Sequence, residues 1–242
     1  MKNNRIPRRD FLKVAGAATV TGSAALVPVG VAATDPAAVT SAPAAAPAAS
    51  GADARLVLTA PEAAFLAAAA DTIIPADELS PSGSDCGLVT FIDRQLASAW
   101  GGGARMYRAG PFHQGTPEQG YQLPLTPRDF FAAGIAAAND WCQKVYGHSF
   151  DRLDPEPRAQ ALKAMEAGNA QFAFFDSALF FQRLLAINIE GYFSDPIYGG
   201  NRNKASWKML QFPGLPATYA GKMDEYRNKR YIADPQSIED FS

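Results

Sequence analysis

The sequence predicts an all-α fold, a single helical domain with long irregular loops, after a cleaved signal peptide and an Ala/Pro linker. Apolar residues recur at spacings of three and four positions in several stretches between residues 59 and 190. Thr or Asp followed within two positions by Pro precedes three of these stretches, as at helix starts. No two stretches alternate apolar and polar residues as paired strands do. The chain is long enough for one domain with a core, and a second full domain is not expected.

The domain opens with a helix whose start has the sequence of a capping box. Thr59 and Glu62 have the spacing of the two capping partners, and a proline lies between them. An apolar stripe follows as far as Pro75, which ends the helix. A polar loop then leads to a second helix from about Leu88 to Trp100, and the glycines at 101–103 end it.

Residues 104–125 form a long irregular loop that is rich in glycine and aromatic residues. A loop of this length in a compact domain is usually functional or disordered, and the aromatic residues favour an ordered surface loop. His113 lies in it. This histidine is a candidate for contact with a partner or ligand, and an ordinary exposed loop histidine has the same sequence features.

Three further helices complete the predicted domain. One begins at Thr126 and runs to about Tyr146, and a short one begins at Asp154 and ends at Gly168. Residues 170–189 are apolar nearly all round, which predicts the central helix of the bundle. Gly191 is expected to end that helix.

Residues 1–33 have the layout of a twin-arginine signal peptide. A weakly apolar stretch follows the export signal, and small residues before position 34 suit cleavage after Ala33. A retained membrane anchor is the alternative, because the stretch is about long enough to span a bilayer, but its glycines and Pro28 make a poor spanning helix. The residues of the export signal are Arg8, Arg9, Phe11 and Leu12.

A linker separates this signal from the domain. Residues 34–54 are rich in alanine and proline, and repeated proline prevents a long helix. The helical domain therefore spans residues 55–242. The twin-arginine route carries proteins that are already folded, usually because a cofactor was inserted first. Since this chain has no visible cofactor motif, we expect it to escort a partner that holds one.

The charge of the chain excludes some classes of partner. Residues 1–33 carry five positive side chains and one negative side chain, so the formal charge changes from −2 to −6 when they are removed. A mildly acidic protein is not expected to bind nucleic acid, which needs a basic stripe, or to dock electrostatically on anionic lipid.

The chain has two cysteines, Cys86 and Cys142. Export would place them in a compartment that permits disulfides. The sequence does not decide whether they form one, because it cannot show that the two cysteines are close. Two thiols cannot by themselves hold an iron–sulfur cluster, and no zinc-binding spacing is present. Cys142 falls on an apolar helix stripe, where we expect it to be buried.

No set of residues indicates catalysis by this chain. The carboxylates near apolar stripes, at Asp71, Asp77, Glu78 and Asp93, are better explained as helix-end caps and solvated charges than as a catalytic pair. The sequence has no GxSxG nucleophile motif, no HExxH metal motif and no phosphate-binding glycine loop. We therefore assign no catalytic, cofactor-binding or metal-binding residue, and a free-standing hydrolase is the least supported hypothesis.

The segment DPIYGGN at residues 195–201 is the most distinctive motif of the chain. Asp195 and Pro196 favour a turn, and the glycines and asparagine that follow permit positive φ and close backbone approach. Tyr192, Phe193 and Tyr198 supply large contact areas. Such a loop serves equally well as a partner interface or as internal scaffold, and both hypotheses stay open.

Here the sequence resembles the gluconate 2-dehydrogenase subunit 3 family, the small subunits of membrane-bound FAD-dependent sugar and polyol dehydrogenases. The matching pieces are the twin-arginine leader, residues 70–77, residues 89–96, Gly110-Pro111-Phe112, residues 120–123, and DPIYGGN followed by Trp207-Lys208. They extend in order across nearly the whole domain. DPIYGGN followed by Trp-Lys is specific, whereas the leader alone is not.

The resemblance implies a non-catalytic role. In such complexes a large flavoprotein of the glucose–methanol–choline oxidoreductase (GMC) type holds FAD and oxidises a sugar, sugar acid or polyol, and a multihaem cytochrome c subunit with haem c passes electrons onward. The small subunit supports maturation of the large one and its export by the twin-arginine translocase, which implies a periplasmic complex associated with the inner membrane.

The residues around DPIYGGN are the expected partner interface under this resemblance. A free-standing secreted protein that binds a small ligand with the loop at 104–125 is the alternative function. The expected interface residues are Tyr192, Phe193, Asp195, Pro196, Tyr198, Gly199, Gly200, Asn201 and Trp207.

Overall fold

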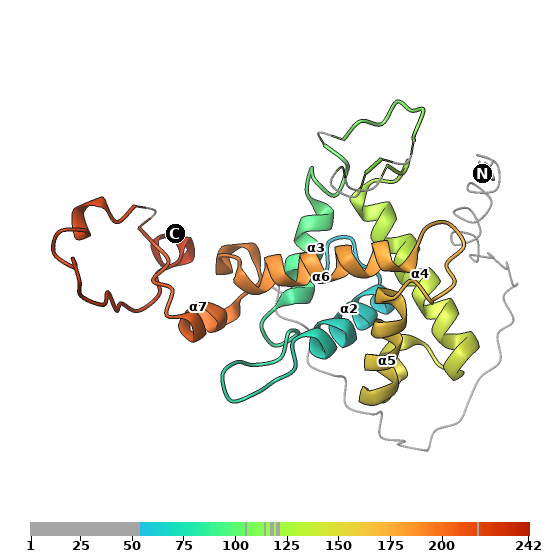
Figure 1. The fold of residues 1–242 in the computed structure, drawn as a ribbon, viewed down its shortest axis with the longest axis horizontal. Helices are drawn as coiled ribbons and strands as arrows, with labels where there is room; N and C mark the ends of the chain where they lie inside the picture. The colour runs from blue at the N-terminus through green and yellow to red at the C-terminus, as the bar shows by residue number, and fades with distance from the viewer. Residues whose placement is uncertain (1–53, 105, 114, 117–118, 120–121, 217) are drawn as a thin grey trace, which may run out of the picture. The chain divides into compact units, whose positions relative to one another are not determined.

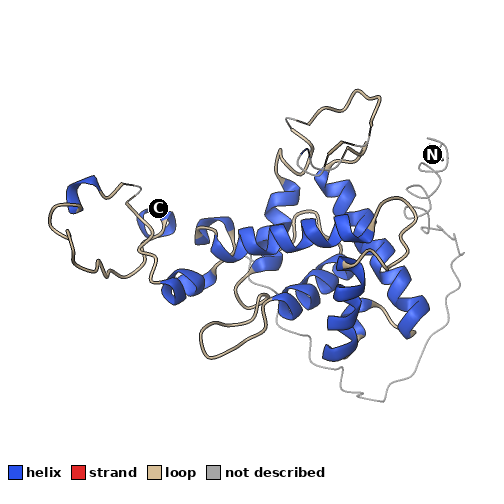
Figure 2. Ribbon diagram, in the orientation of Figure 1, coloured by secondary structure: helices blue, strands red, loops and turns tan. Residues whose placement is uncertain are grey.

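The structure is a computed structural model, and it describes residues 54–104, 106–113, 115–116, 119, 122–216 and 218–242. These residues belong to one compact unit, Ser50–Ser242. Within the described part the α-helices are joined by loops without any β-strand, which confirms the all-α prediction (Figures 1 and 2). The helices are α2 (Ala60–Ile73), α3 (Leu88–Ala97), α4 (Pro127–Tyr146), α5 (Pro155–Glu166), α6 (Ser177–Phe193) and α7 (Ala205–Leu210). The predicted signal peptide at 1–33, with Arg8, Arg9, Phe11 and Leu12, and nearly all of the linker lie outside the described residues.

The first two helices begin where the sequence predicts. The capping box at the start of α2 is present, because the Glu62 carboxylate accepts from the Thr59 backbone N–H over 2.8 Å and Thr59 accepts from Glu62 N in return. α3 ends at Ala97, three residues before the predicted end. Ser98 is extended there and its hydroxyl donates to the Gln95 carbonyl over 2.7 Å, so the chain leaves the helix before the glycines.

Helix α6 is the central helix, as predicted, and it contacts α2, α3, α4, α5 and α7. Its Phe180 side chain is fully buried at the middle of the core. Four other phenylalanine rings have centroids 5.9–6.3 Å from that of Phe180, and they come from α2, α4 and the loop before α6. The core is therefore a cluster of aromatic rings around one helix.

The predicted start and end of the central helix are both wrong. α6 begins at Ser177 rather than at residue 170, because the Asp176 carboxylate accepts from Ala178 N over 2.9 Å and caps the helix there. At the other end the helix continues through Gly191 to Phe193. A Cβ at Gly191 would lie 2.7 Å from Phe91 Cδ1, so this glycine permits α3 and α6 to pack closely instead of ending the helix.

After α7 the described residues fold back on themselves without a further α-helix. A single parallel bridge pairs Gly214 with Gln236, and a short 3₁₀ helix, η7 (Ile238–Phe241), ends the chain. In Figure 1 this segment is the red loop beyond α7. None of the helices in the described ranges has both the length and the hydropathy that a membrane span needs.

Candidate partner interface

The DPIYGGN loop folds into a 3₁₀ turn, η4 (Pro196–Tyr198), that is hydrogen-bonded to α3. Asp195 caps this turn by accepting from Ile197 N over 3.0 Å, and Arg94 of α3 donates to the Ile197 carbonyl over 3.1 Å. Gly199 has φ of 99°, and a Cβ at Gly200 would lie 2.2 Å from the Gly191 carbonyl oxygen. The two glycines therefore serve the backbone geometry of the loop.

Asn201 and Trp207 hold the loop from the inside. Asn201 is fully buried with φ of 45°; its amide donates to the Ser194 carbonyl over 2.9 Å, and its oxygen accepts from Ser206 N and Oγ at 3.0 and 2.9 Å. Trp207 is nearly buried and its indole N–H donates to the Phe193 carbonyl over 3.0 Å. Both side chains are used within the chain, so they are internal scaffold.

The nine predicted interface residues therefore separate into exposed, buried and half-buried members. Phe193 and Tyr198 have 41% and 51% of their surface exposed, and Ile197 between them in the sequence has 37%. The buried members are Tyr192, Gly199, Gly200, Asn201 and Trp207, and Asp195 and Pro196 are half-buried. The exposed side chains offer the largest surface to a partner without rearrangement of the loop.

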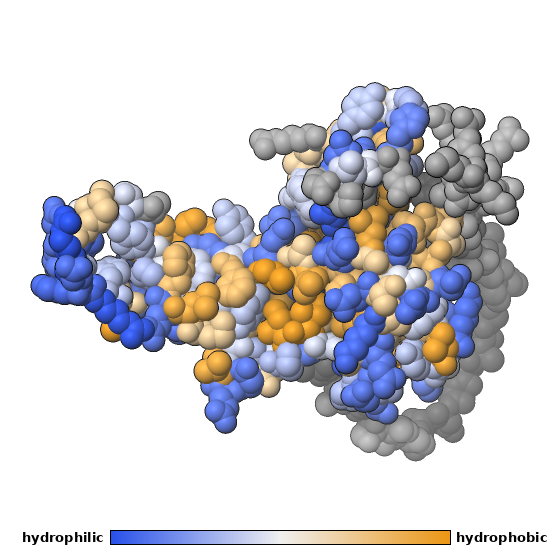
Figure 3. Space-filling view, in the orientation of Figure 1, coloured by the Kyte–Doolittle hydropathy of each residue, from blue (hydrophilic) through white to orange (hydrophobic). Residues whose placement is uncertain are grey.

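The outward face of α6 adds apolar surface that the sequence analysis did not single out residue by residue. Phe181, Leu185, Ile189 and Phe193 recur every four residues on the side of α6 that is not packed on the core. The first two are half-buried, and Ile189 has 45% of its surface exposed. Figure 3 shows apolar residues gathered over the middle of the molecule, where α6 lies in front. A helix that is apolar all round thus has one face in the core and one at the surface.

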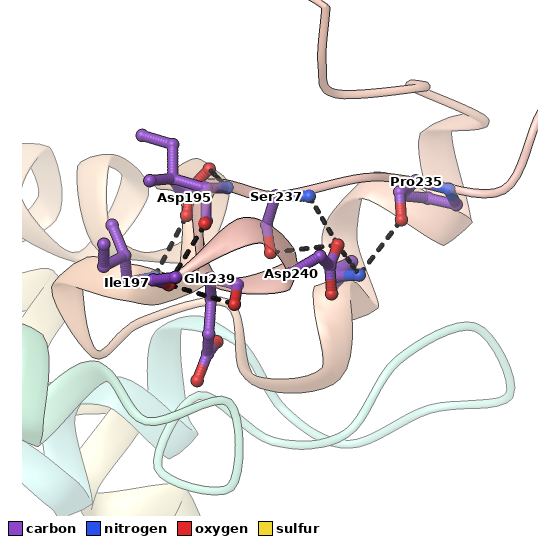
Figure 4. A network of polar contacts seen from close by, with 9 residues as sticks. Asp195, Ile197, Pro235, Ser237, Glu239 and Asp240 are labelled. Carbon is purple, nitrogen blue, oxygen red and sulfur yellow. Dashed lines mark hydrogen bonds and ion pairs between the residues drawn. The ribbon is translucent and has the colours of Figure 1, made fainter.

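A polar network joins the DPIYGGN loop to the last residues of the chain (Figure 4). The second carboxylate oxygen of Asp195 accepts from Ile238 N over 2.9 Å, and Lys204 donates to the Pro235 carbonyl and pairs with Asp240. The pKa of the Asp240 carboxyl is lower than its ordinary value. The main cause is the hydrogen bond from the Lys204 ammonium, and the bond from the Ser237 N–H is a further cause. Sequence reasoning missed this network because no local motif signals a contact across 43 positions.

The other carboxylates singled out in the sequence bind the backbone or face solvent. Asp71 accepts from Ser84 N and Oγ, Asp77 accepts from two backbone N–H groups in its own loop, and Glu78 is exposed. Asp93 is nearly buried and accepts from three successive N–H groups at the start of the domain. Over the described ranges, no three His, Cys, Asp or Glu side chains are grouped so that they could hold a metal ion.

The two cysteines are free thiols, so the disulfide that the sequence left open is not formed in this structure. Cys142 is buried on α4, as predicted from its stripe. Cys86 is buried beside Ala70, Leu88 and Tyr192.

A small cleft of about 250 Å³ lies between the loop at 104–125 and helices α4 and α6. Arg183 and Glu190 contribute charged groups to a mainly apolar lining. Burial raises the pKa of the Glu190 carboxyl, and the charge of Arg183 opposes this effect. His113 is exposed on the same loop, and Gly120 and Tyr121 of the motif at 120–123 lie outside the described residues. The remaining lining residues are Trp100, Met106, Gln119, Pro127, Phe130, Phe131, Ala186 and Ile187.

Among the described residues, the fold and this surface define a helical protein whose central helix has one face in the core and a second apolar face that is exposed at Ile189 and Phe193. Comparison with known families matches residues 60–214 to the family described as gluconate 2-dehydrogenase subunit 3. The chain belongs to this family, and it is therefore of the accessory-subunit type that works with a partner dehydrogenase. No curated protein and no solved structure matched the chain.

Proposed function

We propose that this chain is a non-catalytic accessory subunit of a periplasm-facing, FAD-dependent dehydrogenase for sugars, sugar acids or polyols, of the gluconate 2-dehydrogenase type. It supports maturation of the GMC-type flavoprotein large subunit, which holds FAD, and its export by the twin-arginine translocase. A multihaem cytochrome c subunit with haem c completes the complex at the inner membrane. The observation that carries this proposal is the family match over residues 60–214.

Two features of the chain support the proposal further. The outward apolar face of α6, where Ile189 and Phe193 are exposed among the described residues, is the kind of surface that obligate subunits bury in an interface. The sequence at Arg8 and Arg9 has the layout of an export signal, which would serve a folded partner as well as this chain.

The escort role predicts that the signal of this chain delivers the flavoprotein. Replacing Arg8 and Arg9 with lysine should leave the flavoprotein and its dehydrogenase activity in the cytoplasm, because twin-arginine recognition is lost while the charge is kept. The measurement is dehydrogenase activity with a dye acceptor in periplasmic and cytoplasmic fractions, with the chain expressed together with its neighbouring genes. The Lys2→Arg variant, outside the arginine pair, is the control. Periplasmic activity that survives the double substitution contradicts the escort role.

The cleft beside the loop at 104–125 favours a second candidate, a free-standing secreted protein that binds a small ligand. Co-purification separates the two candidates. An affinity tag inserted in the predicted linker, between Ala45 and Ala46, stays on the chain after cleavage and leaves the C-terminus unchanged. Elution with a large subunit that shows flavin absorbance supports the accessory subunit, and elution of a colourless monomer supports the binding protein.

A further inference from the structure

Residues 195–204, which we call the motif loop, are bonded at their start to the distant 3₁₀ helix η7. Asp195 is the first residue of this loop, and one of its carboxylate oxygens accepts from Ile197 N inside the loop over 3.0 Å. Its other oxygen accepts from Ile238 N of η7 over 2.9 Å. The family match ends at residue 214, before η7 begins. One carboxylate therefore joins the motif to a segment outside the matched residues.

The end of the motif loop is joined to the same helix. Lys204 is the last residue of the loop, and its ammonium donates to the Pro235 carbonyl over 3.1 Å and pairs with Asp240. Asp240 also accepts from Ser237 N over 2.7 Å, so the acid that caps η7 is the acid that Lys204 holds (Figure 4). η7 thus bridges the two ends of the loop.

The segment that leads into η7 is built into the fold. Gly214 pairs with Gln236 in the parallel bridge, and a Cβ at Gly214 would lie 2.1 Å from the Gln236 carbonyl oxygen. Gln236 N also donates to the Pro213 carbonyl over 3.0 Å, and the Gln236 carbonyl accepts from Leu215 N over 2.9 Å. Ser237 is fully buried. These contacts place the start of η7 firmly beside the motif loop.

The backbone of the motif loop has a conformation that needs such support. Four of its residues have positive φ, between 45° and 99°: Gly199, Asn201, Asn203 and Lys204. Glycine and asparagine adopt this left-handed conformation readily, whereas a lysine seldom does, because its Cβ crowds the backbone. Asn201 is held by its own buried hydrogen bonds, but the side chain of Lys204 is held by its bonds to the segment of η7.

We propose that η7 is a clasp that keeps the motif loop in this conformation, with Asp195 and Lys204 as the positioning residues that fasten it. When the clasp opens, Lys204 loses the bonds that offset its left-handed backbone, and Asp195 is held from inside the loop alone. The loop then relaxes, while the helical core around Phe180 keeps its packing. The order of the motif is thus conditional on η7 being in place. This inference goes beyond the proposed function, and its test needs no partner.

The first test removes one hydrogen-bond donor. Ile238→Pro deletes the N–H that Asp195 accepts, and proline suits this position, because it is the first of η7 and Ser237 before it is extended, with ψ of 167°. Ile238→Ala is the matched control, since it shortens the side chain and keeps the N–H. Hydrogen exchange of the purified full chain is read by mass spectrometry on peptides from residues 195–204. Exchange should be about fivefold faster in the proline variant and unchanged in the alanine variant.

The second test separates the side chain of Lys204 from its backbone. Lys204→Met removes the ammonium and keeps the left-handed strain, so the loop should exchange about fivefold faster. Lys204→Gly removes both, and the loop should change less, because glycine adopts positive φ freely. Lys204→Arg keeps the charged bonds and should exchange as the unmodified chain does. Lys208→Met, at an exposed lysine on α7, is the control and should also leave exchange unchanged.

Peptides from α5 report on the helical core and should exchange alike in all of these chains. Equal exchange of the loop in the Ile238→Pro and Ile238→Ala variants overturns the clasp, and so does equal exchange in the Lys204→Met and unmodified chains. Faster exchange in α5 as well as in the loop also overturns it, because η7 would then support the whole domain. The proposed function stands in each case, since neither measurement involves the flavoprotein.

Discussion

Cys142 shows how burial alone sets the chemistry of a single residue in this protein. Its side chain is fully buried on α4, and desolvation raises the pKa of the thiol to about 12, well above the ordinary value of 9.0. Burial also raises the pKa of the Cys86 thiol, with the charge of Asp85 as a smaller cause. Since the thiolate is the reactive form, we expect both buried cysteines to be unreactive in the folded protein.

We predict that neither thiol reacts with Ellman's reagent at pH 8 in the folded protein and that both react fully after unfolding in denaturant. The measurement is the absorbance change of the reagent with the protein, recorded with and without denaturant. A chain that releases no thiol even when unfolded would contain the disulfide and contradict the structure.

The same shift gives an alkaline limit to stability. The pKa of the Cys142 thiol is raised in the folded state. The contribution of this thiol to the free energy of unfolding is therefore fully present below about pH 9 and is lost as the pH rises towards 12. The urea concentration at the unfolding midpoint should therefore decrease as the pH is raised from about 9 to about 12. The Cys142→Ala variant should show a smaller decrease.

At the scale of elements, glycines decide how closely the helices approach the central one. Gly191 of α6 faces Phe91 of α3, and Gly134 of α4 faces the Phe180 ring, where a Cβ would lie only 2.2 Å from Cδ2. Interiors are packed tightly enough that such an overlap must move a ring or a helix. These two glycines permit close packing. Gly147, in contrast, ends α4 in the left-handed backbone conformation, with φ of 80°.

Replacing Gly134 with alanine should lower the free energy of unfolding by about 2 kcal/mol, because the strain of overpacking exceeds the gain in helix propensity. Urea denaturation monitored by circular dichroism gives the value. Gly221→Ala is the matched control, since a Cβ there meets no atom within 4 Å, and it should leave stability unchanged. A Gly134→Ala variant as stable as the unmodified chain would show that the α4–α6 contact has room to adjust.

At the scale of the whole molecule, single carboxylates attach both ends of the domain to its helices. Asp195 and Asp240 hold the C-terminal turn, and Asp93 of α3 accepts from Leu56, Val57 and Leu58 N over 2.5–3.0 Å. Asp93 thereby fixes the chain where it enters the domain from the predicted linker. The chain is thus anchored at entry by Asp93, which the sequence analysis had assigned to caps and solvated charges, and at exit by Asp195, which it had assigned to a turn and a partner interface, and by Asp240, which it had not singled out.

Asp93→Ala should destabilise the domain by about 3 kcal/mol, because buried and partly buried N–H groups lose a charged acceptor. It should also make the bonds near residues 54–58 susceptible to protease under native conditions, which mass spectrometry of limited digests detects. Glu78→Ala, at an exposed carboxylate, should change stability by less than about 0.5 kcal/mol. Equal stability and protease resistance of the two variants would contradict the anchoring role.

The sequence by itself determined the all-α class, the presence and order of helices α2 to α6, and the family, whereas α7 and the bounds of α6 came from the structure. Caps at Thr59 and Thr126, the stripe that buries Cys142 and the apolar run of α6 are local patterns, and local hydrogen bonds and helix periodicity determine them. The tertiary structure alone decided which side chains of the DPIYGGN motif face outward, why Gly191 lies inside a helix, and that Asp195 reaches Ile238. These depend on contacts between distant segments, and a sequence records the residues on each side of such a contact without recording that they meet.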